Sequence, residues 1–198
     1  TDRAISVSNP LQQQFRQQFL ANGTRENIRL SDFFESRTGE LWVATSKGIY
    51  IRKKSDQGFV HVPLTFKGKA VEATKFYRSN AGDLFLGTNY SLFKMDENNF
   101  RLTQLPNTEK DSVVNQIIRS QIVSLCEDTL LNEPALIASP YGHFLAYYIW
   151  SKKKWVSRLD TSMNIIQNLN LRDNLVRKLY KSPTRGKLYL GTGQNGLG

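Results

Sequence analysis

The sequence predicts an all-β protein built from repeated antiparallel sheets, and a recurring template is the main observation behind this prediction. The template reads Gly, polar, Leu, aromatic, aliphatic, small and Thr. Good copies occupy residues 39–45, 82–88 and 186–192, and a degenerate copy occupies residues 133–139. Each copy follows an alternating apolar segment and a turn that contains Gly or Asn, which is the pattern of a β-hairpin. Short strands at regular spacing, separated by such turns, favour an all-β fold.

Each complete repeat unit is expected to hold four short strands, of which the template is the second. First strands are expected at residues 29–34, 71–77, 121–126 and 175–180. Third strands are expected at 48–52, 91–95 and 144–149, and fourth strands at 59–64, 100–105 and 155–159. The template positions Leu41, Leu84, Ala135 and Leu188 are separated by 43, 51 and 53 residues. This period is near that of β-propeller blades, so we expect blades of four-stranded antiparallel sheets.

The repeat divides the chain into about four units, the last of them incomplete, which predicts a partial or truncated propeller. The expected parts are an N-terminal segment at 1–29, blade 1 at 30–66, blade 2 at 67–106, a degenerate blade 3 at 107–160 and a partial blade 4 at 161–198. The missing initial Met and the end within a repeat indicate a fragment of a longer protein.

The N-terminal segment does not match the repeat. Residues 3–7 alternate like a strand, and residues 11–20 fit a short helix or another strand. Because the last unit holds only two expected strands, we expect the N-terminal segment to supply strands that close it.

The template residues indicate how the blades would pack. Small residues fit crowded inner strands near a propeller axis, and they are Ala44, Gly87, Ala138 and Gly191. Large aromatic residues would pack between neighbouring blades, and they are Trp42, Phe85 and Tyr189.

The composition excludes several classes of protein. The single cysteine, Cys126, excludes an intrachain disulfide and a cysteine-based zinc site, and two histidines argue against a histidine-rich metal site. No apolar run reaches the roughly 18 residues that span a bilayer, and no signal peptide is visible. Lys and Arg number 27 against 17 Asp and Glu, which gives a net charge of +10. This charge lies in loops and outer strands without an aromatic and basic stripe, which disfavours nucleic acid and leaves an acidic glycan as a partner.

The best template copies carry a family resemblance. Leu41-Trp42-Val43-Ala44-Thr45 is followed by Gly48-Ile49-Tyr50, and Leu188-Tyr189-Leu190-Gly191-Thr192 is followed by Gly196-Leu197. With these residues the chain resembles the two-component regulator propeller repeat family over most of residues 28–198. The resemblance implies the periplasmic sensor propeller of a bacterial hybrid two-component sensor histidine kinase. Such a propeller detects carbohydrate fragments and relays their binding to kinase or transcriptional output.

The same resemblance implies that this chain holds no catalytic centre and no cofactor. It places the chain in the extracytoplasmic part of an inner-membrane receptor that forms a homodimer, with any membrane contact made by segments outside this chain. The residues agree with a non-enzyme, because the Gly-rich segment at 191–198 lacks the Lys-Ser/Thr of a phosphate-binding loop. The acids Asp32, Glu35, Glu72 and Glu127 are too scattered to nominate a catalytic pair.

The candidate ligand site consists of polar and aromatic residues in the loops that follow the template strands. Aromatic faces and amide groups suit sugar rings, because ring C–H groups stack and hydroxyls form hydrogen bonds. The candidate residues are Lys47, Asn89, Tyr90, Tyr141, His143, Gln194 and Asn195. We expect His61 to be a structural residue on a strand, and we expect Lys152, Lys153 and Lys154 to form a solvated turn.

Two other functions stay open. The blades could serve only as a scaffold or dimerisation propeller, since loops are polar in most proteins. The chain could also belong to a propeller-fold polysaccharide-degrading enzyme, which would need a cluster of acids or a base near the axis. A cytoplasmic WD-type scaffold is disfavoured because the Gly-His and Trp-Asp signatures are absent.

Overall fold

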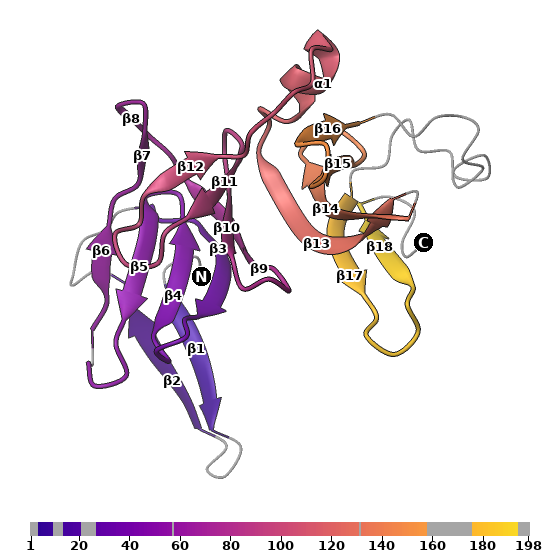
Figure 1. Ribbon diagram of the computed structural model, residues 1–198. Helices are drawn as coiled ribbons and strands as arrows, with labels where there is room; N and C mark the ends of the chain where they lie inside the picture. Colours follow the sequence, from indigo (N-terminus) through magenta and orange to yellow (C-terminus); the bar gives the residue numbers. More distant parts are fainter. Residues whose placement is uncertain are drawn as a thin grey trace. The chain divides into compact units, whose positions relative to one another are not determined.

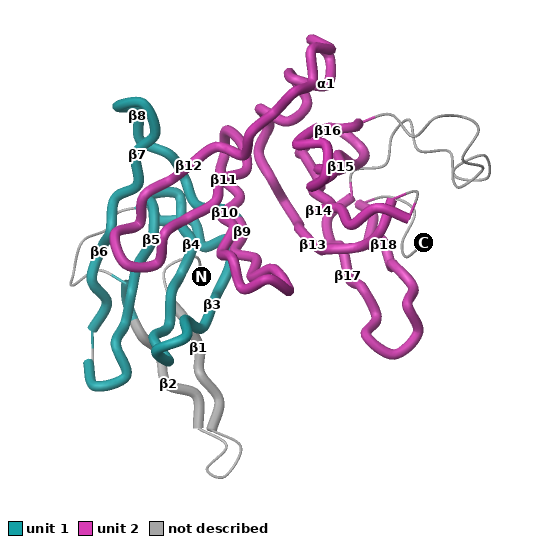
Figure 2. The backbone as a smooth tube through the Cα atoms, viewed as in Figure 1, with its two compact units in different colours: residues 1–74 teal, residues 75–198 magenta. Residues whose placement is uncertain are grey.

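The computed structural model describes residues 4–9, 14–20, 27–56, 58–130, 132–157 and 176–193. In these residues antiparallel strands predominate, and a single short helix is present (Figure 1). The predicted all-β class is therefore confirmed. The chain divides into two compact units, residues 1–74 and residues 75–198 (Figure 2).

Unit 1 contains a four-stranded antiparallel meander. Its strands are β3 (Leu30–Glu35), β4 (Leu41–Thr45), β5 (Gly48–Arg52) and β6 (Val60–Val62), paired in chain order. The N-terminal strands β1 (Ala4–Asn9) and β2 (Gln14–Phe19) pair with each other. A short hairpin of β7 (Thr65–Phe66) and β8 (Lys69–Ala70) follows the meander. The template segment thus forms the second strand of its sheet, as predicted.

Unit 2 repeats this meander. One sheet consists of β9 (Ala73–Arg78), which begins just before the unit boundary, β10 (Leu84–Thr88), β11 (Leu92–Met95) and β12 (Leu102–Gln104). The next consists of β13 (Ile122–Leu130), β14 (Glu133–Pro140), β15 (Ala146–Ile149) and β16 (Lys154–Val156). Helix α1 (Ser112–Ile117) connects these two sheets. The strands β17 (Val176–Lys181) and β18 (Leu188–Thr192) form a final antiparallel pair.

The template threonine closes the turn that follows its strand. Thr45 Oγ1 donates to the carbonyl of Gly48 at 3.0 Å and accepts from the N–H of Lys47 at 3.1 Å. Thr88 repeats the arrangement, since its Oγ1 donates to the carbonyl of Ser91 at 2.9 Å and accepts from the N–H of Tyr90 at 3.1 Å. Both threonines are fully buried. The last template residue therefore fixes the turn that presents the predicted ligand-site residues.

A buried serine shapes the turn before each good template copy. The hydroxyls of Ser36 and Ser79 accept the N–H groups of Glu40 and Asp83, both at 3.0 Å. Ser182 accepts the N–H of Arg185 at 3.1 Å. A glycine with positive φ follows in each turn, and these glycines are Gly39, Gly82 and Gly186. The glycine was expected from hairpin chemistry, whereas the repeated serine was not recognised as part of the pattern.

The degenerate copy keeps the register of the good copies. Ala135 of β14 pairs with Asp128 of β13, just as Leu41 of β4 pairs with Glu35 of β3. Ser139 takes the place of the template threonine, but its hydroxyl donates across to the carbonyl of Val176 at 2.6 Å. The third sheet is therefore a complete four-stranded unit despite its altered sequence.

The core of unit 2 lies on both faces of the β13–β16 sheet. One cluster includes Phe85 of the preceding sheet together with Leu136 and Tyr148. The other includes Ile137 and Leu179, the second of which belongs to β17. The expectation that template aromatics pack between neighbouring sheets is confirmed for Phe85. Cys126 also lies in this second cluster, as expected for a small apolar residue.

Three local features differ from the prediction or extend it. Residues 112–117 form a helix because Asp111 caps it by accepting the N–H groups of Val113 and Val114. The β7–β8 hairpin was not predicted either. Of the two possibilities for residues 11–20, the strand is present at 14–19. Among the described strands, β1 pairs with β2 and β17 with β18, so closure of the last unit by the N-terminal segment stays a prediction.

Candidate functional site

In unit 1 the turn that contains Lys47 is held by a histidine. His61 Nε2–H donates to the carbonyl of Lys47 at 2.8 Å, and the His61 ring stacks on Tyr50 with centroids 4.7 Å apart. These contacts agree with the expectation that His61 is a structural residue. The Lys47 side chain itself is exposed.

Unit 2 brings two of the predicted turns to the same end of its sheets. Tyr90 lies between β10 and β11, and Tyr141 lies between β14 and β15. The hydroxyl of Ser91 donates to the carbonyl of Ile118 at 2.9 Å, and the N–H of Tyr141 donates to the carbonyl of Gln121 at 2.7 Å. Both turns are thus fastened to the short segment between α1 and β13. We call this end of unit 2 the aromatic rim, defined by residues 89–91, 140–143 and 177.

The aromatic rim presents two tyrosine side chains to solvent. Tyr90 is 40% exposed and Tyr141 is 50% exposed. The guanidinium of Arg177 lies 5.6 Å from the centroid of the Tyr141 ring, within the range of a cation–π contact. Asn89 is exposed and His143 is half-buried in the same two turns. Gln194 and Asn195 lie outside the described residues.

A pocket lies at the opposite end of the same strands. Asp83 precedes β10 whereas Tyr90 follows it, so the pocket and the aromatic rim are separated by the length of a strand. The pocket has a volume of about 570 Å³, which is in the range of small-molecule sites. Its lining comes from Ser79, Asn80, Ala81, Asp83, Glu127, Asp128, Thr129, Pro134, Ala135, Trp150 and Lys181. We call it the acidic pocket, because its carboxylates outnumber its cations.

Glu127 is fixed at this pocket by hydrogen bonds from the β9 region. Its Oε2 accepts the backbone N–H of Asn80 at 2.7 Å and the hydroxyl of Tyr77 at 3.5 Å. The Tyr77 oxygen in turn accepts the backbone N–H of Glu127 at 2.9 Å. Burial, with the neighbouring Glu127 charge, raises the pKa of Tyr77 to about 12. Tyr77 therefore stays protonated and serves as a hydrogen-bonding support.

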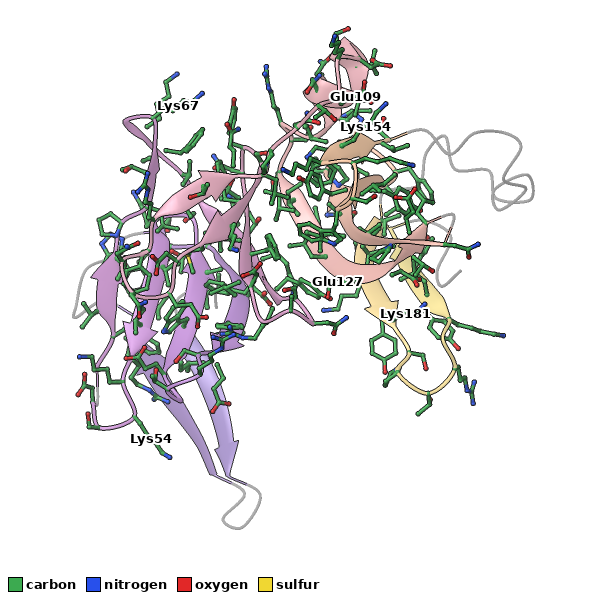
Figure 3. The ribbon with its side chains drawn as sticks, in the orientation of Figure 1. Lys54, Lys67, Glu109, Glu127, Lys154 and Lys181 are labelled. Carbon is green, nitrogen blue, oxygen red and sulfur yellow. The ribbon has the colours of Figure 1, made fainter. Side chains whose placement is uncertain are left out.

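The other two carboxylates of the acidic pocket each contact a lysine. Asp128 Oδ1 lies 2.5 Å from Lys181 Nζ, and Asp83 Oδ1 lies 2.8 Å from Lys94 Nζ. Figure 3 shows Glu127 and Lys181, which extend from β13 and β17. Trp150 contributes an aromatic surface that packs edge-on against Tyr148 at 4.9 Å and tilted against Phe85 at 5.7 Å.

The acidic pocket was not predicted, because single acids carry no signal until the first strands are aligned by register. Asp128 and Lys181 occupy the same position in successive sheets, opposite Ala135 and Leu188. Aligning the first strands in this register would have placed an acid beside a lysine at one sheet end. The fold brings Glu127 and its sequence neighbour Asp128 to one pocket with Asp83, which precedes a strand of a different sheet.

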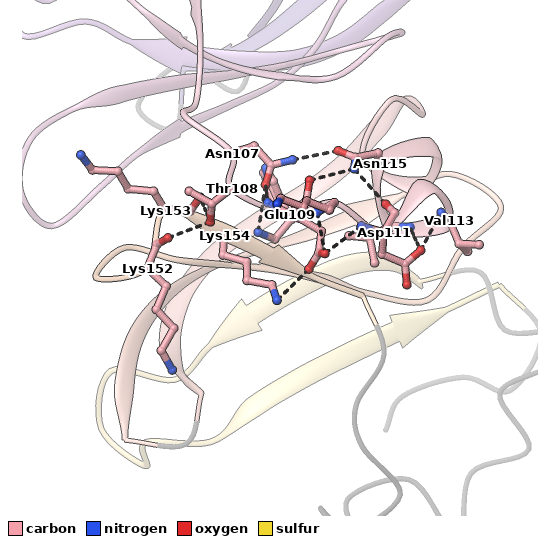
Figure 4. A network of polar contacts seen from close by, with 12 residues as sticks. Asn107, Thr108, Glu109, Asp111, Val113, Asn115, Lys152, Lys153 and Lys154 are labelled. Carbon is pink, nitrogen blue, oxygen red and sulfur yellow. Dashed lines mark hydrogen bonds and ion pairs between the residues drawn. The ribbon is translucent and has the colours of Figure 1, made fainter.

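The basic turn at 152–154 is exposed at Lys152 and Lys153, in agreement with the predicted solvated turn, and it also carries ion pairs. Lys154 Nζ lies 3.0 Å from Glu109, and Lys152 Nζ lies 2.5 Å from Glu133. The hydroxyl and N–H of Thr108 donate to carbonyls in the turn. Figure 4 shows the contacts of Glu109 and Thr108, which join the connection before α1 to the β15–β16 turn. Two of the three lysines are therefore ion-paired, and the network holds the β15–β16 turn to the connection before α1.

Neither a metal centre nor a reactive thiol is present in the part of the chain that the structure describes. No group of three or more His, Cys, Asp or Glu side chains there could hold a metal ion. Burial raises the pKa of Cys126 to about 12, so its thiol stays protonated near neutral pH. Within the described ranges, no helix is long and apolar enough to cross a membrane.

Comparison with known proteins gives structural neighbours only. No protein-family model matches the chain, and no curated protein matches its sequence. The extracellular domain of BT4673 from B. thetaiotaomicron, assigned to a one component system, is similar with a TM-score of 0.72 and 18% identity, over 100% of this chain and 24% of that chain. The extracellular domain of BT3049 from the same organism, assigned to a hybrid two component system, has a TM-score of 0.60 and 16% identity, over 85% and 21%.

A further neighbour is PorZ, a bacterial surface component of the type-IX secretion system of Porphyromonas gingivalis. Its TM-score is 0.65 at 14% identity, over 96% of this chain and 28% of that chain. The chain thus spans about a quarter of the length of these structures. At such identities the likeness shows the fold alone, which these extracellular domains share with a surface component of a secretion system.

Proposed function

We propose that this chain is a non-catalytic, ligand-sensing part of the extracytoplasmic propeller of a bacterial two-component regulatory sensor, and that its ligand is a carbohydrate fragment. In this proposal its sheets are blades of a propeller in the periplasmic part of an inner-membrane receptor that acts as a homodimer. Ligand binding is relayed to kinase or transcriptional output located in other parts of the receptor.

The aromatic rim is the observation that carries the proposal. Tyr90 and Tyr141 are exposed on turns that are fixed by buried hydroxyl groups and by bonds to residues 118–121. Exposed tyrosines on such turns suit a sugar because the ring face stacks on C–H groups while the hydroxyl forms hydrogen bonds. Arg177 beside Tyr141 adds a positive charge that would favour an acidic sugar unit. The structural likeness to extracellular sensor domains supports the same proposal.

Titration of the chain against neutral and acidic oligosaccharides tests the proposal. We expect calorimetry to detect binding of at least one oligosaccharide, and Tyr141→Ala to weaken it by about tenfold, which corresponds to about 1.4 kcal/mol. Tyr180→Ala is the matched control, because Tyr180 is 56% exposed but lies on β17 away from the two turns. An acidic ligand should also lose affinity as salt is raised.

Two results would contradict the proposed function. One is the absence of any heat or melting shift across the oligosaccharide panel. The other is an equal loss for Tyr141→Ala and Tyr180→Ala, since a specific rim should respond only to the first. In a full-length receptor, unchanged signalling by Tyr141→Ala would favour the scaffold or dimerisation role instead.

A further inference from the structure

The two ends of the sheets in unit 2 differ in charge. The aromatic rim carries Arg177, and the opposite end carries the acidic pocket with Asp83, Glu127 and Asp128. Among the described lining residues, Lys181 is the only cation beside three acids, and Lys94, which pairs with Asp83, makes the local balance three acids to two bases. This local excess of negative charge occurs in a chain of net charge +10. A ligand suited to one end is therefore poorly suited to the other.

The pocket carboxylates are held in place and still have acceptor capacity. Each one uses a single oxygen for its protein contacts, namely Oε2 of Glu127, Oδ1 of Asp128 and Oδ1 of Asp83. Within the described residues, the second oxygen of each has no hydrogen-bond partner. Fixed acceptors lose little side-chain entropy when a ligand binds, which favours recognition of a donor-rich group.

The spacing of these carboxylates suits a molecule and not a bare ion. Asp83 comes from the β9–β10 turn, and Glu127 and Asp128 occupy adjacent positions of β13. In the described part of the chain, these three carboxylates do not form a metal-binding group. A pocket of about 570 Å³ is also far larger than an ion requires. The ligand that fits is a small molecule with several hydrogen-bond donors.

Trp150 adds an apolar surface to the pocket. Its ring is half-buried, and its packing against Tyr148 and Phe85 fixes its orientation. An indole face next to carboxylates attracts an ammonium group through its quadrupole and accommodates ring C–H groups. Pro134 and Ala135 extend this apolar side of the lining.

We propose that the acidic pocket binds a small organic ammonium ligand, in which a protonated amine faces the carboxylates and a ring or methylene face rests on Trp150. This inference does not rest on the proposed sensing of sugars at the aromatic rim. Amino sugars carry both a protonated amine and a ring face, and linear polyamines carry protonated amines and methylene groups, so both fit this description.

The test uses three probes on the whole chain. They are the disaccharide of glucosamine, its N-acetylated counterpart without the amine, and spermidine. We expect the amine-bearing disaccharide or spermidine to bind and to change the tryptophan fluorescence, and the N-acetylated disaccharide to bind at least tenfold more weakly. Binding of the glucosamine disaccharide alone identifies an amino sugar as the source, and binding of spermidine alone identifies a polyamine.

Isosteric variants locate the binding. Glu127→Gln and Asp83→Asn should each lower the affinity by about fivefold, the upper range for partly exposed charge pairs. Asp56→Asn is the matched control, because Asp56 is an exposed acid of unit 1 outside the pocket. If Glu127→Gln lowers the stability of the fold, Asp83→Asn still tests the pocket, because Asp83 is only half-buried.

The inference is overturned if neither amine probe binds, or if the N-acetylated disaccharide binds as tightly as the free amine. It is also overturned if Glu127→Gln and Asp83→Asn bind the amine as the unaltered chain does. If Tyr141→Ala loses oligosaccharide binding at the aromatic rim but still binds the amine, the two ligands bind at separate sites.

Discussion

The third sheet, formed by β13 to β16, and the β17–β18 pair differ in how deeply their template strands are buried. The third sheet contains the degenerate template copy, yet the segment from Ala135 to Pro140 is buried throughout. The β17–β18 pair contains a good copy, yet every residue of β18 is only half-buried. The template therefore determines the hairpin, whereas burial depends on how many elements pack around it. Strand β14 has β13 and β15 as neighbours and a core cluster on each face.

Polar contacts hold the pair to the third sheet. Ser124 Oγ accepts the N–H of Leu179 at 2.9 Å, and Ser139 Oγ donates to the carbonyl of Val176 at 2.6 Å. The ion pair of Asp128 with Lys181, which both line the acidic pocket, adds a further contact. These polar contacts add to apolar packing, because Val176 and Leu179 of β17 are buried in a core cluster with residues of β13, β14 and β15.

The largest expected effect comes from leucine truncation in the two regions. Leu136→Ala should destabilise the chain by about 3 kcal/mol, because Leu136 is completely buried and its removal leaves a cavity. Leu190→Ala removes the same atoms from a half-buried site and should cost about 1 kcal/mol. Urea denaturation of the whole chain measures both. Equal losses would instead show that β18 is packed as tightly as β14.

A serine variant tests the polar attachment of β17. Ser139→Ala removes the buried hydroxyl that bonds to the carbonyl of Val176, and it should cost about 1–2 kcal/mol because that carbonyl is then buried without its partner. Amide hydrogen exchange should increase more in β17 than in β15. Ser55→Ala at an exposed site of unit 1 is the control. Faster exchange in β15 alone would place the role of Ser139 within its own sheet instead.

Much of this architecture was predictable from local signals. Glycines and polar turn residues marked the hairpins, and alternation marked the strands, so the template strands agree with the structure to within about two residues. Alternation in Arg3 to Val7 likewise identified β1. These features depend only on neighbouring residues, which is why a single sequence reveals them.

Features that depend on distant partners were missed. Asp111 caps α1 within a loop that shows no helical periodicity, and Lys154 finds Glu109 across 45 residues of chain. The acidic pocket forms only when β13 lies beside the β9–β10 turn and β17. Of the predicted ligand residues, the structure brings Asn89, Tyr90, Tyr141 and His143 to one end of unit 2, because all four lie in turns that follow template strands.

The smallest expected effect concerns pH and the attachment of the third sheet at its β15–β16 turn. The N–H groups of Asp111 and Lys110 together with the ammonium of Lys154 hold the pKa of Glu109 below its ordinary value of 4.5. Because the folded pKa is the lower one, this carboxylate stabilises the fold fully above pH 4.5, and the contribution disappears as pH falls through the folded pKa.

Hydrogen exchange can separate this attachment from that of β17. The N–H of Thr108 donates to the carbonyl of Lys153 within the Glu109 network, and the N–H of Leu179 donates to the hydroxyl of Ser124, which does not titrate. Below pH 4.5, protection from exchange should therefore decrease at Thr108 and stay constant at Leu179. Glu109→Gln should reduce the acid-dependent change at Thr108. It should not abolish the change, because Glu133, whose pKa is lowered by Lys152 and Ser151, holds the same turn. If protection decreases equally at both amides, acid acts on the whole of unit 2, and the two attachments are not independent.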